Sequence, residues 1–70
     1  MKIELTQAEA LVLHDLLYRI SDGTEAIKDL AEYYVLWTIE CQLERELVIP
    51  GADDYSEFIE QARDTVRNNY

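Results

Sequence analysis

The 70-residue sequence has few of the residue types on which most small catalytic or metal-binding sites depend. It contains one cysteine, one histidine, one proline and two glycines. One Cys and one His fall short of the three or four ligands of a zinc site, and the single Cys41 excludes an internal disulfide framework. His14 builds no catalytic triad, because Asp15 lies about 100° away from it on a helix. We therefore expect no enzymatic activity, no metal and no other cofactor.

Basic residues are also scarce. Six Lys and Arg stand against 15 Asp and Glu, which gives a net charge of −9. The bases are scattered from Lys2 to Arg67 and form no cluster for phosphate contacts, so direct binding of nucleic acid is not expected. The excess of acid predicts either a solvated surface or attraction to a basic protein partner. The candidate residues of such an acidic surface are Asp53, Asp54, Glu57 and Glu60.

Long apolar runs are absent. The most hydrophobic stretch, residues 33–43, contains Glu40 and is about half as long as the roughly 20 residues of a bilayer span. Glu4 and Glu9 interrupt the apolar core that a secretion signal would need. Together with the single cysteine, which suits a reducing compartment, these features predict a cytoplasmic protein without membrane contact.

What the chain does have is apolar surface, since 49% of its residues are hydrophobic. This content favours one folded domain over residues 1–70. A chain this short hides only about 60% of the surface that its unfolded form exposes. Extra burial, through self-association or a partner, is therefore expected.

Three helices are predicted. The first begins at Thr6, whose side chain can cap a helix while Glu9 reaches back to it. Its core stripe is expected to comprise Ala10, Leu13, Leu16, Leu17 and Ile20. Gly23 is expected to end this helix in the left-handed conformation, and Asp22 or Thr24 to cap the next.

The second helix is predicted over residues 25–47, because no Gly or Pro occurs between Gly23 and Pro50. As an isolated segment, residues 33–39 could also form a strand. The helix has two apolar faces. The expected core face, which includes Cys41 as buried packing, comprises Ala26, Ile27, Leu30, Tyr34, Trp37, Cys41 and Val48. The second face comprises Leu36, Ile39, Leu43 and Leu47.

The third helix is predicted to begin at Asp53 or Asp54, with Asp54 as a cap three residues before Glu57. Its apolar residues form a single stripe: Tyr55, Phe58, Ile59, Ala62 and Val66.

These elements predict an all-α fold in which a long central helix is flanked by two shorter ones. The second face of the central helix is then free to pair with another copy in a two-fold homodimer. The predicted partner interface comprises Leu36, Ile39, Leu43 and Leu47, extended by Leu11 and Tyr18. The alternative is a monomer whose third helix covers that face.

The chain also resembles a class of short uncharacterised bacterial helical proteins. The likeness lies in Leu5 to Leu13, Ala31 to Trp37, Leu43 to Pro50, and Asp54-Tyr55. These are packing and capping residues, so the resemblance implies the helical layout and no activity or ligand.

Two functions remain open from the sequence. The first is a non-enzymatic interaction or regulatory module that acts as a helical homodimer. The second is an acidic decoy inhibitor, of the kind carried by phages or plasmids, that blocks a basic nucleic-acid-binding protein.

Overall fold

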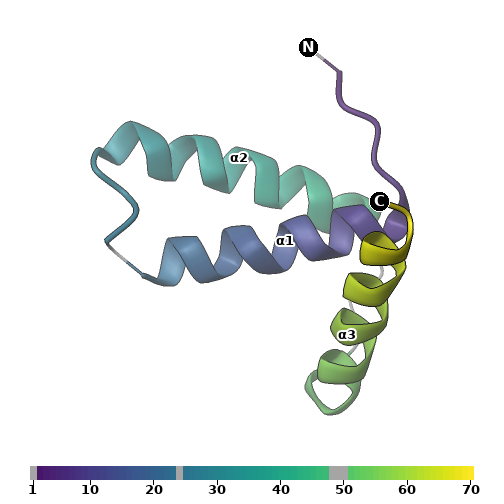
Figure 1. Ribbon diagram of the computed structural model, residues 1–70. Coiled ribbons are helices and arrows are strands. Elements are labelled where there is room, and N and C mark those ends of the chain that lie inside the picture. The colour runs from purple at the N-terminus through teal and green to yellow at the C-terminus, as the bar shows by residue number, and fades with distance from the viewer. Residues whose placement is uncertain (1, 24, 48–50) are drawn as a thin grey trace.

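The computed structural model describes residues 2–23, 25–47 and 51–70. Within them the chain forms three α-helices and no strand (Figure 1). Helix α1 spans Gln7–Asp22, α2 spans Leu30–Glu46 and α3 spans Ala52–Asn68. The all-helical prediction is confirmed, including a helix where residues 33–39 could have formed a strand. The predicted long second helix is wrong, because the three helices have 16, 17 and 17 residues.

Helix α1 begins as predicted. The Thr6 side chain accepts a hydrogen bond from the Glu9 backbone N–H at 3.1 Å, and the Glu9 carboxylate accepts one from the Thr6 N–H at 2.9 Å. These two bonds satisfy two of the backbone donors that a helix start leaves free. The expected left-handed end is wrong: Gly23 has a φ of −98°.

Helix α2 begins at Leu30, five residues later than predicted. Asp29 caps it by accepting from the Ala31 N–H at 2.8 Å, and Glu32 accepts from the Lys28 and Asp29 N–H groups. This second capping box fixes the start, so residues 25–28 lie outside the helix. Asp22 therefore does not cap α2. Thr24 lies outside the described residues, as do Val48 and the predicted proline stop at 48–50.

Helix α3 begins at Ala52 with Gly51 as its N-cap. Gly51 has no side chain to accept a bond from the helix start, and the predicted Asp54 cap is wrong. Asp53 and Asp54 lie instead in the first helical turn, where a negative charge interacts favourably with the helix dipole.

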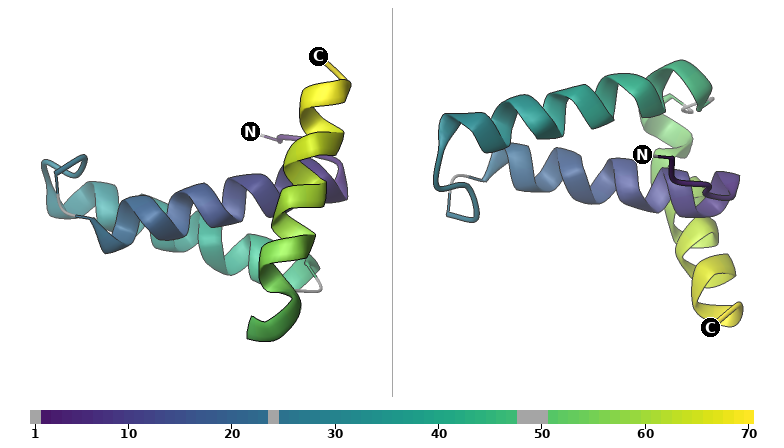
Figure 2. Two further views of the ribbon diagram at one scale, coloured as in Figure 1. Left: turned by 60° about the horizontal axis from the view of Figure 1, so that its bottom comes forward. Right: turned by 90° about the horizontal axis from the view of Figure 1, so that it is seen from above.

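Helix α1 is the spatial centre of the molecule. Helix α2 runs back antiparallel beside it, and α3 crosses the N-terminal part of α1 steeply (Figures 1 and 2). In the described part of the chain α1 packs against both neighbours, whereas no Cα atom of α3 lies within 8 Å of one in α2. The expectation that the second helix is central, shielded by the other two, is therefore wrong.

The buried apolar core is small and lies mainly between α1 and α3. Leu11, Ile59 and Ala62 form its centre, and Ala8, Val12 and Tyr55 pack around them. The predicted α3 stripe is thus largely confirmed, except that Phe58 is exposed. In the predicted α1 stripe Leu17 is buried, but Leu16 is exposed.

Candidate interaction surface

One face of α2 is turned towards α1, and it is the face that the sequence analysis assigned to a partner. Leu36 and Leu43 are half-buried, and Leu47, the residue that caps the helix C-terminus, is buried. We call these three residues the inner face of α2. Because α1 covers it, the inner face does not supply a free surface.

Polar contacts explain why this face turns inward. Nε2 of His14 lies 3.2 Å from Oε1 of Glu44, and the Ser21 hydroxyl donates to Glu40 at 3.0 Å. His14 is buried and Glu40 is half-buried. Nε2 of His14 and the Glu40 carboxylate each find a partner across the α1–α2 contact, whereas the described residues give the buried Nδ1 of His14 no hydrogen-bond partner. A buried polar group without a partner costs about 1–3 kcal/mol. The two helices therefore pair most favourably when the face of α2 that is flanked by Glu40 and Glu44 is turned towards α1.

A second side of α2, roughly 130° around the helix from the inner face, carries an apolar stripe that the protomer leaves exposed. Leu30, Tyr34 and Trp37 expose 59%, 54% and 50% of their surface, and Cys41 is exposed as well. We call these four residues the outer face of α2. The sequence pattern predicts core positions for these four residues, and this prediction, including a buried Cys41, is wrong.

Aromatic rings order part of the outer face. The ring of Trp37 lies 6.0 Å from that of Tyr33 and 5.8 Å from that of Tyr34, both in tilted geometry. Such pairs contribute about 0.5–1.5 kcal/mol each. Trp37 is therefore held by its own helix while half of it remains open to solvent.

The remaining residues of the predicted interface divide between core and surface. Leu11 is buried against α3. Tyr18 is 63% exposed and Ile39 is 37% exposed. The structure therefore does not bring the six predicted residues together on one open surface.

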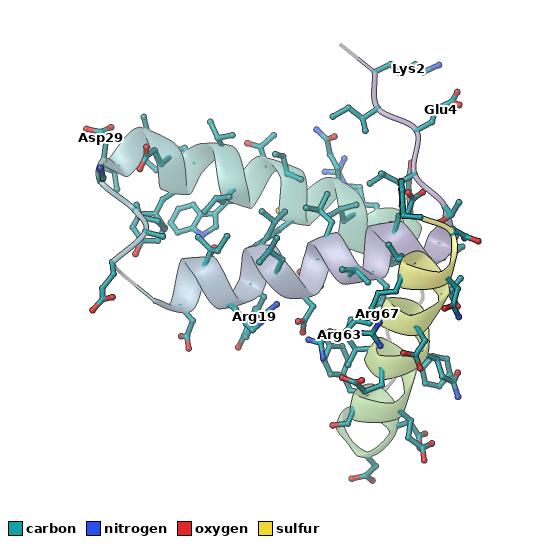
Figure 3. All side chains as sticks on the ribbon, viewed as in Figure 1. Lys2, Glu4, Arg19, Asp29, Arg63 and Arg67 are labelled. Carbon is teal, nitrogen blue, oxygen red and sulfur yellow. The ribbon has the colours of Figure 1, made fainter. Side chains whose placement is uncertain are left out.

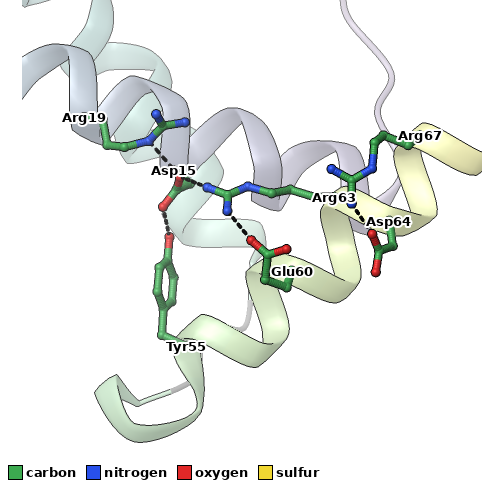
Figure 4. A network of polar contacts seen from close by, with 7 residues as sticks. All are labelled: Asp15, Arg19, Tyr55, Glu60, Arg63, Asp64 and Arg67. Atoms are coloured by element: carbon green, nitrogen blue, oxygen red, sulfur yellow. Dashed lines mark hydrogen bonds and ion pairs between the residues drawn. The ribbon is translucent and has the colours of Figure 1, made fainter.

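A polar cluster joins α1 to α3 beside the apolar core (Figure 4). Buried Asp15 lies at its centre and accepts from the Tyr55 hydroxyl at 2.6 Å, from Nε of Arg19 at 3.0 Å and from Nη2 of Arg63 at 3.1 Å. Arg63 also donates to Glu60 at 2.5 Å. Both oxygens of Asp15 are thus engaged in holding the helices together.

The cluster shifts two pKa values in opposite directions. Burial alone would raise the pKa of Asp15, but hydrogen bonds from Tyr55 and Arg19 and the charges of Arg19 and Arg63 outweigh it and lower that pKa. Burial and the neighbouring Asp15 carboxylate raise the pKa of Tyr55 to about 12. Near neutral pH the pair is therefore a carboxylate accepting from a neutral phenol, which is a stable structural bond.

The predicted acidic surface lies on the first half of α3, where Asp53, Asp54, Glu57 and Glu60 are all exposed. Glu60 is the one engaged by Arg63. Further along the helix Asp64 pairs with Arg67, and Arg63 and Arg67, both labelled in Figure 3, lie in this second half. Among the described residues Asp53, Asp54 and Glu57 have no ion-pair partner, so the negative charge of the group that is not neutralised lies at the start of α3.

The described residues contain no group of His, Cys, Asp and Glu that could hold a metal ion. Neither α1, α2 nor α3, as described, is long and apolar enough to cross a bilayer. Comparison of the chain with family models, with curated protein sequences and with solved structures gives no match.

Sequence reasoning missed both the outer face and the Asp15 cluster. One signal for the orientation of α2 was available: in an antiparallel helix pair, His14 and Ser21 fall opposite Glu44 and Glu40. The Asp15–Arg19 pair was also visible, because its i,i+4 spacing places both side chains on one helix face.

Proposed function

We propose that this chain is a non-enzymatic interaction module that acts as a homodimer through the outer face of α2. The observation that supports the proposal most strongly is the exposure of Leu30, Tyr34, Trp37 and Cys41 in one stripe. Exposed aromatic residues are characteristic of the central contacts of protein interfaces. This stripe replaces the inner-face leucines as the surface that meets the partner.

The total exposed area supports the same proposal. A compact chain of 8.2 kDa exposes roughly 4,500 Å². This chain exposes 5726 Å², to which the extended residues 2–6 contribute. The excess of about 1,200 Å² is larger than the roughly 800 Å² that each partner buries in an interface of standard size. A second copy bound to α2 would therefore reduce the exposed area of each chain to about that of a compact chain of the same mass.

The test is the mass of the chain in solution, measured by sedimentation over a concentration series. We expect the mass to rise from 8.2 kDa to twice that value. Trp37→Gln should weaken the dimer at least about tenfold, because a half-exposed Trp at the centre of the face supplies much of its apolar area.

The matched control is Val35→Gln. Val35 is 58% exposed on the same helix but points away from the outer face, so this variant should dimerise like the unmodified chain. A chain that keeps the mass of one copy at every concentration would overturn the proposal. Weakening by Val35→Gln and not by Trp37→Gln would show that another side of α2 meets the partner, which overturns the assignment of the outer face.

The acidic decoy is the second candidate, and the exposed Asp53, Asp54 and Glu57 at the start of α3 favour it. Binding through these charges would weaken steeply between low and moderate salt, whereas an apolar dimer would barely respond. This candidate would be contradicted if a basic nucleic-acid-binding protein bound the chain equally well at moderate salt and after charge reversal at Glu57.

A further inference from the structure

The outer side of α2 is hollowed by an open groove of about 420 Å³. Its lining comes from α2 alone: Tyr34, Trp37, Thr38, Cys41, Gln42 and Arg45. At about 100° per residue, the lining points away from the inner face that contacts α1. A groove formed by one helix cannot enclose a small molecule, but it can receive side chains of a second helix.

The lining has the spacing with which paired helices receive side chains. Tyr34, Trp37, Thr38 and Cys41 stand at positions i, i+3, i+4 and i+7, which is the four-residue hole that accepts one side chain of a facing helix. The same spacing continues one turn later, in Thr38, Cys41, Gln42 and Arg45. The groove thus consists of two successive holes, an aromatic one and one with smaller or flexible walls.

We propose that α2 of a second copy lies antiparallel in this groove, with the two-fold axis between Thr38 and Cys41. This inference rests on the proposed dimer and specifies its orientation. In this register the partner's Trp37 enters the hole with flexible walls, and the partner's Cys41 enters the aromatic hole. A large side chain meets a wide hole and a small one meets a narrow hole, as close packing requires.

A parallel pair in register lacks this complementarity. Trp37 of each copy would enter the hole already lined by Tyr34 and Trp37, and the small Cys41 would enter the wider one. The two Arg45 side chains would also lie side by side and repel each other. In the antiparallel pair Arg45 instead reaches the ring of the partner's Tyr34, where a cation–π contact is favourable. The two helix dipoles also run antiparallel, which is a favourable arrangement.

Disulfide trapping distinguishes the two orientations. In a Cys41→Ser background, Tyr34→Cys and Arg45→Cys are made as separate variants, and their masses are first measured under reducing conditions. After mixing and oxidation, the antiparallel pair should give a crosslink between the two different variants. Each variant alone should give none, because 11 residues separate the two positions by roughly 16 Å and a disulfide needs Cα atoms within about 7 Å.

Each other outcome has a definite meaning. Crosslinks within each single variant would show a parallel dimer, which overturns the inference and leaves the proposed function standing. Dimeric mass with no crosslink would place the contact elsewhere and also overturn the inference. If the unmodified chain has the mass of one copy, the proposed function itself fails.

A measurement on the unmodified chain covers the case in which the variants no longer associate. The exposed Cys41 thiol should react quickly with a maleimide when the chain is dilute. The reaction should slow at least tenfold as dimer forms, because the thiol becomes enclosed by the partner's Tyr34 and Trp37. Unchanged reactivity in a sample of dimeric mass would overturn the inference.

Discussion

The contact between α1 and α3 and the outer face of α2 are both built from apolar and aromatic side chains, but only the first is closed within the protomer. At the first, Ile59 and Ala62 pack on Leu11 while Tyr55 and Arg63 hold Asp15. At the second, three large side chains remain half or more exposed. In the described part of the chain the backbone of α3 stays more than 8 Å from that of α2, measured between Cα atoms. In this chain the apolar surface that is buried is thus the surface flanked by polar contacts between helices.

The largest loss of stability is expected when apolar burial between α1 and α3 is removed. Ile59→Ala should lower the free energy of unfolding by about 2–4 kcal/mol, because it deletes buried methyl groups from the core cluster. Urea denaturation followed by circular dichroism measures this loss.

Phe58→Ala on the same helix is the control, and it should cost less than about 1 kcal/mol because half of the ring is exposed. If the two losses were equal, the buried cluster would carry no special share of the stability, and the contrast between the two regions would not hold.

A smaller effect is expected from the polar half of the same contact. Asp15→Asn keeps the size of the side chain but removes the charge that Arg19 and Arg63 share. The loss should be about 1–3 kcal/mol, the cost of leaving hydrogen bonds to a buried charged group unmade. The measurement is again denaturation by urea.

Asp64→Asn is the matched comparison, because Asp64 forms an exposed ion pair with Arg67 on α3. Exposed pairs contribute about 0–1 kcal/mol. A loss at Asp64 as large as the loss at Asp15 would mean that burial adds nothing to the Asp15 cluster.

The same contrast explains how much the sequence could predict. The α3 stripe was identified, since its apolar residues lie on one side and Ile59 and Ala62 are buried. Helix α2 has two apolar faces, and periodicity alone cannot decide which one is covered. The choice depends on Ser21 and His14, which meet Glu40 and Glu44 only after the helices pair.

The Asp15 cluster was predictable only in part. Arg19 is a neighbour on the same helix turn, but Tyr55 and Arg63 stand 40 and 48 residues away in the chain. Their approach follows from the steep crossing of α1 by α3, which a helical periodicity does not specify. The start of α2 was missed for a simpler reason, because the Asp29–Glu32 capping box lies within a run of good helix formers.

The smallest effects appear only at the extremes of pH, where the Asp15–Tyr55 pair titrates. The pKa of Asp15 is lowered in the folded state, so its contribution is complete above the unfolded value of about 3.9. It is lost as the pH falls through the folded value. Acid should therefore destabilise the unmodified chain more than Asp15→Asn, which serves as the control in a series of denaturation curves.

At alkaline pH the titration of Tyr55 determines how the stability of the fold changes with pH. Its pKa is raised to about 12 in the folded state, so the stabilisation is complete below the unfolded value of about 10 and is lost as the pH rises through 12. Asp15→Asn should lower the pKa of Tyr55, because a neutral amide no longer opposes the phenolate charge. The absorbance of tyrosinate measures this pKa, and Tyr55→Phe identifies the step that belongs to it. If the pKa of Tyr55 were the same in Asp15→Asn as in the unmodified chain, burial alone would raise it. Asp15 would then stabilise the contact through its arginines and not through Tyr55.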